Sequence, residues 1–149
     1  MIRIMTYLEP RIEKAGSVLF EELDEINEVI FIMMGTIEIG FEINKTRKFV
    51  IRFDKSHMQG AYNCIFDERS MFIVMCKTEC SGYFIRKHKW KSVLKEFPDV
   101  RDQFQQMCHE EYTLKIKNKM IEIKDKYLRK YKSRADFNQI LSVQPNEYN

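Results

Sequence analysis

The feature that most constrains the fold of this 149-residue chain is a change in the spacing of its hydrophobic residues near the middle. In the first half, residues such as Ile37, Ile39 and Phe41 alternate with polar or small residues. A period of two directs alternate side chains to one face of a β-strand. In the second half the spacing becomes three and four residues, which is typical of one face of an α-helix. The sequence therefore predicts a β-rich part followed by helices.

The first half is predicted to contain a series of short strands separated by polar turns. Such a series is typical of a β-sandwich or β-barrel. Glu28–Met34 is almost continuously hydrophobic, so we expect it to be buried on both faces. Asn44–Lys48 is expected to be a polar turn. The predicted strands are Ser17–Phe20, Glu28–Met34, Thr36–Ile43, Phe49–Phe53, Met71–Cys76 and Gly82–Arg86.

Two helices are predicted in the second half. Trp90, Val93, Leu94 and Phe97 lie on one face of the first helix, and Pro98 ends this helix or begins the next. Residues 99–132 contain neither glycine nor proline, so they are expected to form one long helix. At 100° per residue its hydrophobic side chains form two stripes on roughly opposite sides. The first stripe is Met107, Leu114, Ile121 and Leu128, and the second is Tyr112, Ile116, Met120, Ile123, Tyr127 and Tyr131.

A helix with two hydrophobic sides usually has two packing partners. We expect one stripe to pack on the strands and the other to bind a second copy of the chain, which makes the protein a homo-oligomer. Asn118 and Asp125 lie between the residues of the first stripe, so the contact is expected to be weak. The simpler alternative is a surface helix with scattered hydrophobic residues.

Composition excludes several classes of protein. Lys plus Arg is 25 and Asp plus Glu is 22, and the resulting charge of +3 does not indicate nucleic-acid binding. No run of about 20 hydrophobic residues is present, so this stretch is not expected to span a membrane. The N-terminus lacks a secretory signal and the four cysteines are expected to be free thiols, so we expect a cytoplasmic location.

The distribution of charge along the chain is uneven. Residues 9–44 contain nine acidic and two basic residues, whereas residues 110–134 contain nine basic and four acidic residues. A solvated helix face accounts for the basic segment in the simplest way. The alternative is that this segment is attracted to an acidic protein or to anionic lipid headgroups.

The cysteines and histidines predict neither a metal site nor catalysis. Cys76 and Cys80 form the only close pair, whereas a structural zinc site needs four well-placed ligands. His57 and His88 have no nearby partner in the sequence, and three separated histidines do not supply the ligands of a metal-dependent β-barrel enzyme. We therefore expect no metal, no cofactor and no enzymatic activity.

Met58–Met71 is the segment most indicative of a binding site. It follows a predicted strand, contains Gly60 near its start and has Arg69 and Ser70 before the next strand. Backbone amides after a glycine bind anions, and an arginine supplies a planar fork for phosphate oxygens. Taken alone, the segment is equally consistent with a short connecting turn.

Three blocks of sequence resemble the cyclic nucleotide-binding domain family, over about residues 10–130. The first comprises Lys14–Phe20 and Glu22–Ile39, which have the family's glycines and acidic turn around a hydrophobic strand. The second, Gly60–Ser70, lies where the family has its phosphate-binding cassette, and the third, Trp90–Pro98, is similar to the helix that ends in Phe-Pro. The surroundings of Glu42–Asn44 and Phe72–Ile73 are most similar to the potassium-channel type of member, such as those of ciliates.

This resemblance implies a mostly β fold with C-terminal helices: a β-roll, which is a double-stranded β-helix similar to a jelly roll, then a hinge helix and a long lid helix. It places the domain at residues 7–132, with the roll at about 7–86, the helices at about 87–132 and a polar tail at 133–149. It also implies cAMP or cGMP as the ligand.

The resemblance also implies which residues bind the ligand. Arg69 takes the place of the arginine that binds the cyclic phosphate, Ser70 lies beside it, and Gly60 is the cassette glycine. Ala61 replaces the glutamate that accepts the ribose hydroxyl, and the cassette is one residue shorter than usual. Met58 either faces the purine or belongs to the core. The expected ligand-binding residues are Met58, Gly60, Ala61, Tyr62, Asn63, Arg69 and Ser70.

Two functions follow from this set of residues. The first is a cytoplasmic regulatory domain of a larger protein, expected to be a potassium or cation channel in a membrane, in which the state of the lid helix is coupled to gating. The second is a degenerate roll that no longer binds nucleotide and serves interaction or assembly. In that case Phe137–Leu141 is a candidate self-ligand, and the alternative for this segment is a loose tail.

Overall fold

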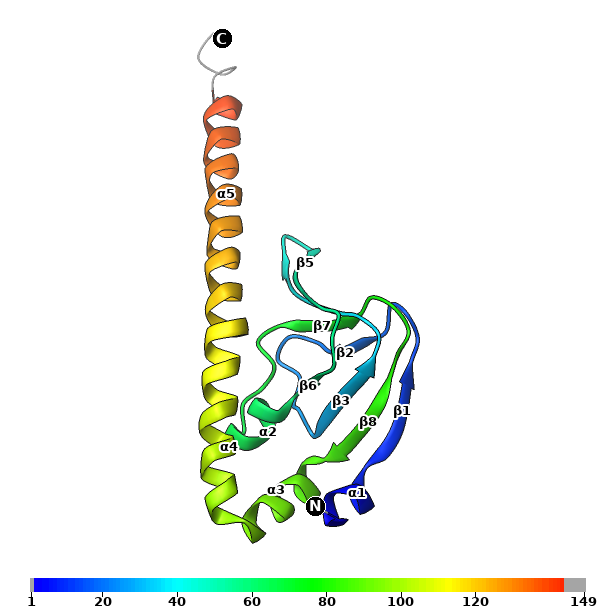
Figure 1. Cartoon of the computed structure of the whole chain (residues 1–149). Coiled ribbons are helices and arrows are strands. Elements are labelled where there is room, and N and C mark those ends of the chain that lie inside the picture. The colour runs from blue at the N-terminus through cyan, green and yellow to red at the C-terminus, as the bar shows by residue number, and fades with distance from the viewer. Residues whose placement is uncertain (1, 144–149) are drawn as a thin grey trace.

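The computed structural model describes residues 2–143, and the side chains of residues 4–134. Its strands form two antiparallel four-stranded sheets, with orders β1-β8-β3-β6 and β2-β7-β4-β5. The mostly β fold with C-terminal helices is thus confirmed (Figure 1). The strands are β1 (Glu9–Glu13), β2 (Val18–Phe20), β3 (Glu28–Met34), β4 (Ile37–Ile43), β5 (Thr46–Phe53), β6 (His57–Gln59), β7 (Ile73–Cys76) and β8 (Cys80–Arg86).

The alternating residues of the first half form the core of the roll, to which the long helix adds Tyr127 against Phe41. In β4, Ile37, Ile39 and Phe41 are each at most 2% exposed, as their spacing predicts. Val29 in β3 and Ile85 in β8 are fully buried on the opposite sheet. Burying side chains from two facing sheets is what gives such a roll its stability.

Several local expectations differ from the structure. The predicted turn Asn44–Lys48 is confined to its first two residues, since β5 already begins at Thr46. The expectation that β3 is buried on both faces is wrong at its end, where Met33 and Met34 are 54% and 71% exposed. The pairing of β3 with β8 is irregular there, which takes these side chains out of the regular ladder.

The helices are α1 (Ile2–Tyr7), α2 (Ala61–Phe66), α3 (Lys87–Glu96), α4 (Pro98–Glu111), η1 (Tyr112–Lys117) and α5 (Asn118–Val143). The last three form one uninterrupted helix beside the roll, and its end extends beyond the sheets (Figure 1). The predicted end of this helix at Lys132 is wrong, because the helix continues to Val143 into the expected polar tail.

The long helix contains one turn of π-helix at η1. In an α-helix each four-residue step rotates a side chain by about 40° beyond a full turn, so residues spaced by four drift off one face. The wider π-turn offsets this drift. As a result Cys108, Ile116 and Met120 all lie on the side that packs against the roll. This local rotation is a departure from the regular helix that the sequence predicts.

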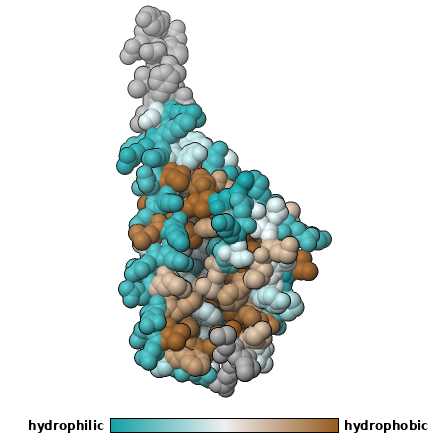
Figure 2. All heavy atoms as spheres, in the orientation of Figure 1, coloured by the Kyte–Doolittle hydropathy of each residue, from teal (hydrophilic) through white to brown (hydrophobic). Residues whose placement is uncertain are grey.

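The two stripes of the long helix lie where the sequence places them. Met120 is fully buried, and Ile116, Ile123, Tyr127 and Tyr131 pack against the core of the roll. The other stripe faces away: Met107, Leu114, Ile121 and Leu128 are all exposed. In the view of Figure 2, hydrophilic residues dominate the outer side of the helix, and hydrophobic side chains gather where it meets the roll.

Candidate functional site

The cassette segment has a backbone that depends on one glycine. Gly60 connects β6 to α2 with φ of +87°, in the left-handed region that favours glycine. A Cβ atom there would also lie 2.7 Å from the carbonyl oxygen of Glu28. The Gly60 carbonyl accepts a hydrogen bond from the Cys64 amide at 2.9 Å, which starts the short helix α2. Gly60 therefore sets the direction of α2 relative to the roll.

A cavity of about 370 Å³ lies between this segment and the long helix. This volume is within the usual range of small-ligand sites, about 300–1,000 Å³. Its wall on the roll side contains five of the seven predicted ligand-binding residues, namely Met58, Gly60, Ala61, Tyr62 and Asn63. Its wall on the helix side contains Cys108, Glu111, Tyr112, Lys115 and Ile116.

An aromatic stack joins the cassette to the long helix. The rings of Tyr62 in α2 and Tyr112 in η1 are stacked at 4.1 Å with an angle of 14° between their planes. Phe66 extends the cluster, with its ring 4.8 Å from Tyr62 and 5.8 Å from His109. Aromatic pairs of this kind contribute about 0.5–1.5 kcal/mol beyond the area they bury. The long helix is thus held against the cassette by these ring contacts.

The two stacked tyrosines are uncharged at neutral pH. Burial is the main cause that raises the pKa of Tyr112. The neighbouring Tyr62 and then Glu68 raise it further. Burial also raises the pKa of Tyr62, together with the nearby carboxylate of Glu68. Because neither hydroxyl ionises near neutral pH, the stack carries no negative charge that would repel an anionic ligand.

Arg69, the residue expected to bind phosphate, does not line this cavity. Its side chain is exposed, and Nη1 donates a hydrogen bond to the carbonyl oxygen of Leu23 at 3.0 Å. Leu23 has a φ of +69°, which is uncommon for a large side chain. The backbone on both sides is fixed, since the Leu23 amide donates to the Ser70 carbonyl and the Ser70 amide to Asp24. Arg69 therefore lies outside the lining of the cavity, with its guanidinium hydrogen-bonded to the Leu23 carbonyl.

Ser70 and Asn63 are used by the cassette itself. The Ser70 hydroxyl is buried and donates to the Phe72 carbonyl at 2.7 Å. Asn63 donates from its side chain to the Arg69 carbonyl at 3.2 Å. Both residues line a small void of about 20 Å³, to which Ile116 of the long helix also contributes. Of the seven predicted residues, five thus line the cavity, Ser70 is buried within the cassette, and Arg69 lies outside the cavity lining.

His57 is a cavity residue that sequence reasoning assigned no role. Its Nδ1 donates to the Lys55 carbonyl at 2.8 Å, and its ring stacks on Phe53 with 5.2 Å between centroids. Burial lowers the pKa of His57, so the ring is neutral near pH 7. Among the residues with described side chains, its Nε2 is buried without a hydrogen-bond partner.

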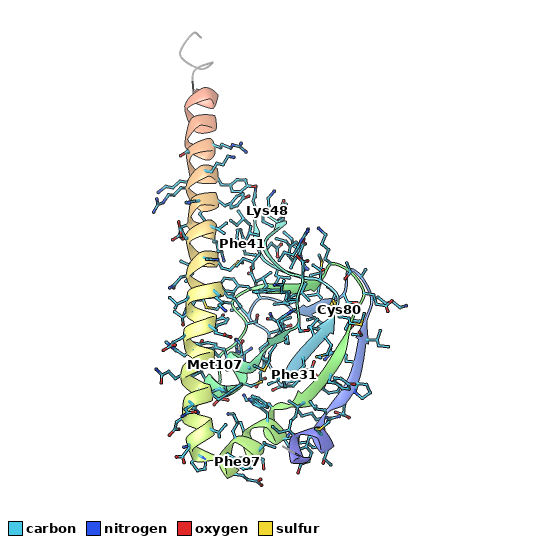
Figure 3. The ribbon with its side chains drawn as sticks, viewed as in Figure 1. Phe31, Phe41, Lys48, Cys80, Phe97 and Met107 are labelled. Atoms are coloured by element: carbon cyan, nitrogen blue, oxygen red, sulfur yellow. The ribbon has the colours of Figure 1, made fainter. Side chains whose placement is uncertain are left out.

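The cassette is also tied to the hinge helix by charge. Asp67, which follows the last residue of α2, forms ion pairs with two lysines of α3, Lys87 at 2.6 Å and Lys91 at 2.7 Å. The hydrogen bond from Lys87, followed by that from Lys91, lowers the pKa of Asp67 to about 2. Trp90 of the same helix packs against Phe31 and Phe104 (Figure 3 labels Phe31). These contacts connect α2 to α3, and Trp90 connects α3 to α4.

Two other features lie outside the predicted site. A groove of about 620 Å³ at the start of α3 is lined by Arg86, Lys87 and His88, among others, and by none of the predicted ligand-binding residues. Phe137–Leu141, the candidate self-ligand, belongs to the last turns of α5, and its side chains lie outside those described. In Figure 1 this part of the backbone extends past the sheets.

The described residues hold no arrangement suited to a metal ion, since no three His, Cys, Asp or Glu side chains among them are grouped to hold one. Cys64, Cys76, Cys80 and Cys108 are free and buried. Of the helices in the described part of the chain, none has the length and hydrophobicity needed to cross a membrane.

The roll, the cassette and the two helices define the fold of cyclic nucleotide-binding domains, and solved structures of that class match the chain. The cyclic nucleotide-binding homology domain and C-linker of zELK channels, crystallised in the presence of cAMP, match with a TM-score of 0.62 at 15% identity. The match covers 72% of this chain and 54% of that one. No family model and no curated protein sequence matches.

Two further matches come from proteins of other kinds. The regulatory subunit of a cAMP-independent protein kinase A from Trypanosoma brucei has a TM-score of 0.55 at 17% identity over 67% of this chain. A cAMP-binding acyltransferase from Mycobacterium smegmatis has a TM-score of 0.57 at 16% identity over 72% of this chain. The chain spans 37% of the first protein and 34% of the second. At these identities the likeness establishes the fold.

Proposed function

We propose that the chain is a regulatory domain of the cyclic nucleotide-binding type, and not an enzyme. The observation that carries this proposal is the cavity of about 370 Å³ enclosed by the cassette on one side and by the lid on the other. A ligand that enters it touches α2 and η1 together. Its binding energy is therefore coupled to the position of the long helix, which is the property a regulatory domain needs.

The ligand that fits the proposal is cAMP or cGMP, and it competes with the lid. In the closed form Tyr112 covers Tyr62, and Ile116 lines the small void that Ser70 also lines. A nucleotide has to displace these side chains, and Arg69 has to exchange the Leu23 carbonyl for a phosphate oxygen. Each requirement lowers the fraction of binding-competent molecules, and the apparent affinity falls by that fraction. We expect dissociation constants in the millimolar to high micromolar range.

The larger protein is proposed to be a potassium or cation channel with this domain in the cytoplasm. The similarity to the homology domain of a channel supports this part of the proposal. Movement of the long helix would then be the signal passed to the pore. The similarity to a kinase regulatory subunit supports a regulatory role without a preference for channels.

A second function is favoured by the position of Arg69. The Arg69 guanidinium is hydrogen-bonded to the Leu23 carbonyl, and Ala61 stands where the family has a hydrogen-bond acceptor. The cassette residues that line the cavity therefore offer no charged group to the phosphate or to the ribose. A roll closed by its own lid then serves as a structural module for assembly. This alternative requires that no cyclic nucleotide binds at any accessible concentration.

Replacing Arg69 with alanine is expected to weaken cyclic nucleotide binding about 10- to 150-fold, because a charge-assisted hydrogen bond to phosphate is lost. Calorimetric titration with cAMP and cGMP, at micromolar and millimolar concentrations, measures the change. Arg52→Ala is the matched control, since Arg52 pairs with Glu38 on the outside of the roll. Equal affinity of the Arg69 variant and the unmodified protein would remove Arg69 from the site.

A further inference from the structure

The outer face of the long helix carries exposed hydrophobic residues that the roll does not cover. Leu114, Ile121 and Leu128 are spaced by seven residues and are 65%, 38% and 47% exposed. Single exposed hydrophobic residues are ordinary, but a repeat of seven along one helix is the pattern of a helix-helix contact. The opposite side of the same helix is already occupied by the roll. The roll therefore does not supply a partner for the outer face.

The charge along this helix is divided between its two ends. In α4, residues 98–111, there are four acidic residues and one arginine. Residues 112–134 contain nine basic and two acidic residues. Two such helices side by side in the same direction would bring basic segment against basic segment. In opposite directions the acidic end of each lies beside the basic end of the other, which is electrostatically favourable.

We propose that the outer face binds a second copy of this chain with the two long helices antiparallel and Ile121 at the twofold axis. In this register Leu114 faces Leu128 of the second copy, because each is seven residues from Ile121. The same symmetry brings Glu110 beside Lys132 and Lys117 beside Asp125 of the second copy. A twofold contact uses one surface patch twice, so the pairs form on both sides of the axis.

Leu114, Ile121 and Leu128 do not line the cavity, so this contact goes beyond the function proposed above. It is a reversible contact, because only three hydrophobic residues and exposed charge pairs support it. Exposed ion pairs stabilise by less than about 1 kcal/mol each and are screened by salt. The dimer is therefore expected to dissociate as ionic strength rises, which a contact of purely hydrophobic residues does not do.

Cysteine cross-linking measures the direction of the helices. Two variants, Leu114→Cys and Leu128→Cys, are oxidised separately and as a mixture, with different tags so that each covalent dimer is identified on a gel. The antiparallel arrangement predicts a disulfide between the two variants in the mixture, several-fold above the dimer that either variant forms alone. The four natural cysteines are buried, and Lys95→Cys on α3 serves as a control.

Three outcomes overturn the proposal. Efficient cross-linking within each separate variant shows parallel helices. A strict monomer in sedimentation up to hundreds of micromolar, at low salt, excludes the second copy as the partner. Cosedimentation of that monomer with phosphatidylserine vesicles assigns the face to a membrane. All of these measurements are made without nucleotide, so the failure of this proposal is distinguishable from the failure of the proposed function.

A reversal of charge tests the register in the same experiment. Glu110→Lys and Lys132→Glu each place like charges together, so each is expected to raise the dimer dissociation constant about fivefold at low salt. In a mixture, the dimer that contains one copy of each variant again has opposite charges at both residue pairs across the axis. The mixed dimer is therefore expected to be tighter than either dimer of identical variants. Equal constants for all three pairings contradict the proposed register.

Discussion

Replacing Met120 with aspartate is expected to release the long helix from the roll while the two sheets stay folded. Met120 is fully buried between α5 and the roll, so the new carboxylate loses its hydration without gaining a partner. An unpaired charge at such a position costs about 3–5 kcal/mol. Swinging the helix outward relieves that cost. It uncovers Phe41 of β4, whose ring packs on Tyr127 of α5, but β4 stays hydrogen-bonded to β5 and β7. The lid is thus the part that gives way.

Hydrogen exchange measures this release segment by segment. Amides of α5 are expected to lose protection, while those of β4 and β8 keep it. Met107→Asp is the matched control, because Met107 is 44% exposed on the helix (labelled in Figure 3) and its replacement should leave protection unchanged. Equal loss of protection in the sheets and in α5 would show that the lid and the roll unfold as one unit, contrary to this expectation.

Replacing Gly82 with alanine is expected to destabilise the roll by about 3 kcal/mol, near the upper end of what overpacking costs. Gly82 lies in β8, between β1 and β3, and a Cβ there would overlap the carbonyl oxygen of Phe31. The strand has no free space to move into, because both of its edges are paired. Chemical denaturation measures the loss as a lower transition midpoint.

Gly16→Ala is the matched control for this variant. Gly16 has a φ of +88°, but a Cβ there would have no neighbour within 4 Å. The cost of that replacement is the strain of the left-handed backbone alone, about 1 kcal/mol. A loss at Gly82 no larger than the loss at Gly16 would mean that β8 shifts to admit the methyl group, and that the close approach to β3 is not essential.

The fold could be predicted from the sequence wherever a strand or helix was long. β4 was recognisable because Ile37, Ile39 and Phe41 alternate, and the long helix because it lacks glycine and proline. β1 and β6 were missed because they are short and have the sequences Glu-Pro-Arg-Ile-Glu and His-Met-Gln, in which polar residues interrupt any hydrophobic run. α2 was missed for the same reason: with six residues it completes fewer than two turns.

The candidate site could be predicted in part. The sequence placed Gly60 at the start of the cassette, and it placed Tyr112 on the same helix stripe as Ile116 and Met120, which pack against the roll. The direction of the Arg69 side chain does not, because it depends on the carbonyl of Leu23, more than 40 residues earlier in the chain. The π-turn at η1 was equally inaccessible, since packing against the roll and not the local sequence decides where a helix is rotated.

The central claim is that cyclic nucleotide binds in the cavity between the cassette and the long helix, and that Tyr112 and Ile116 of this helix cover part of the site and compete with it. Its most direct test is a calorimetric titration of Tyr112→Ala with cAMP and cGMP, beside the unmodified protein. Removing the stack on Tyr62 destabilises the closed lid by about 1 kcal/mol, so apparent affinity should rise about fivefold. Leu114→Ala, in the same turn but exposed, should leave it unchanged. Absence of binding up to millimolar nucleotide in all three proteins, or weaker binding by Tyr112→Ala, would contradict the account.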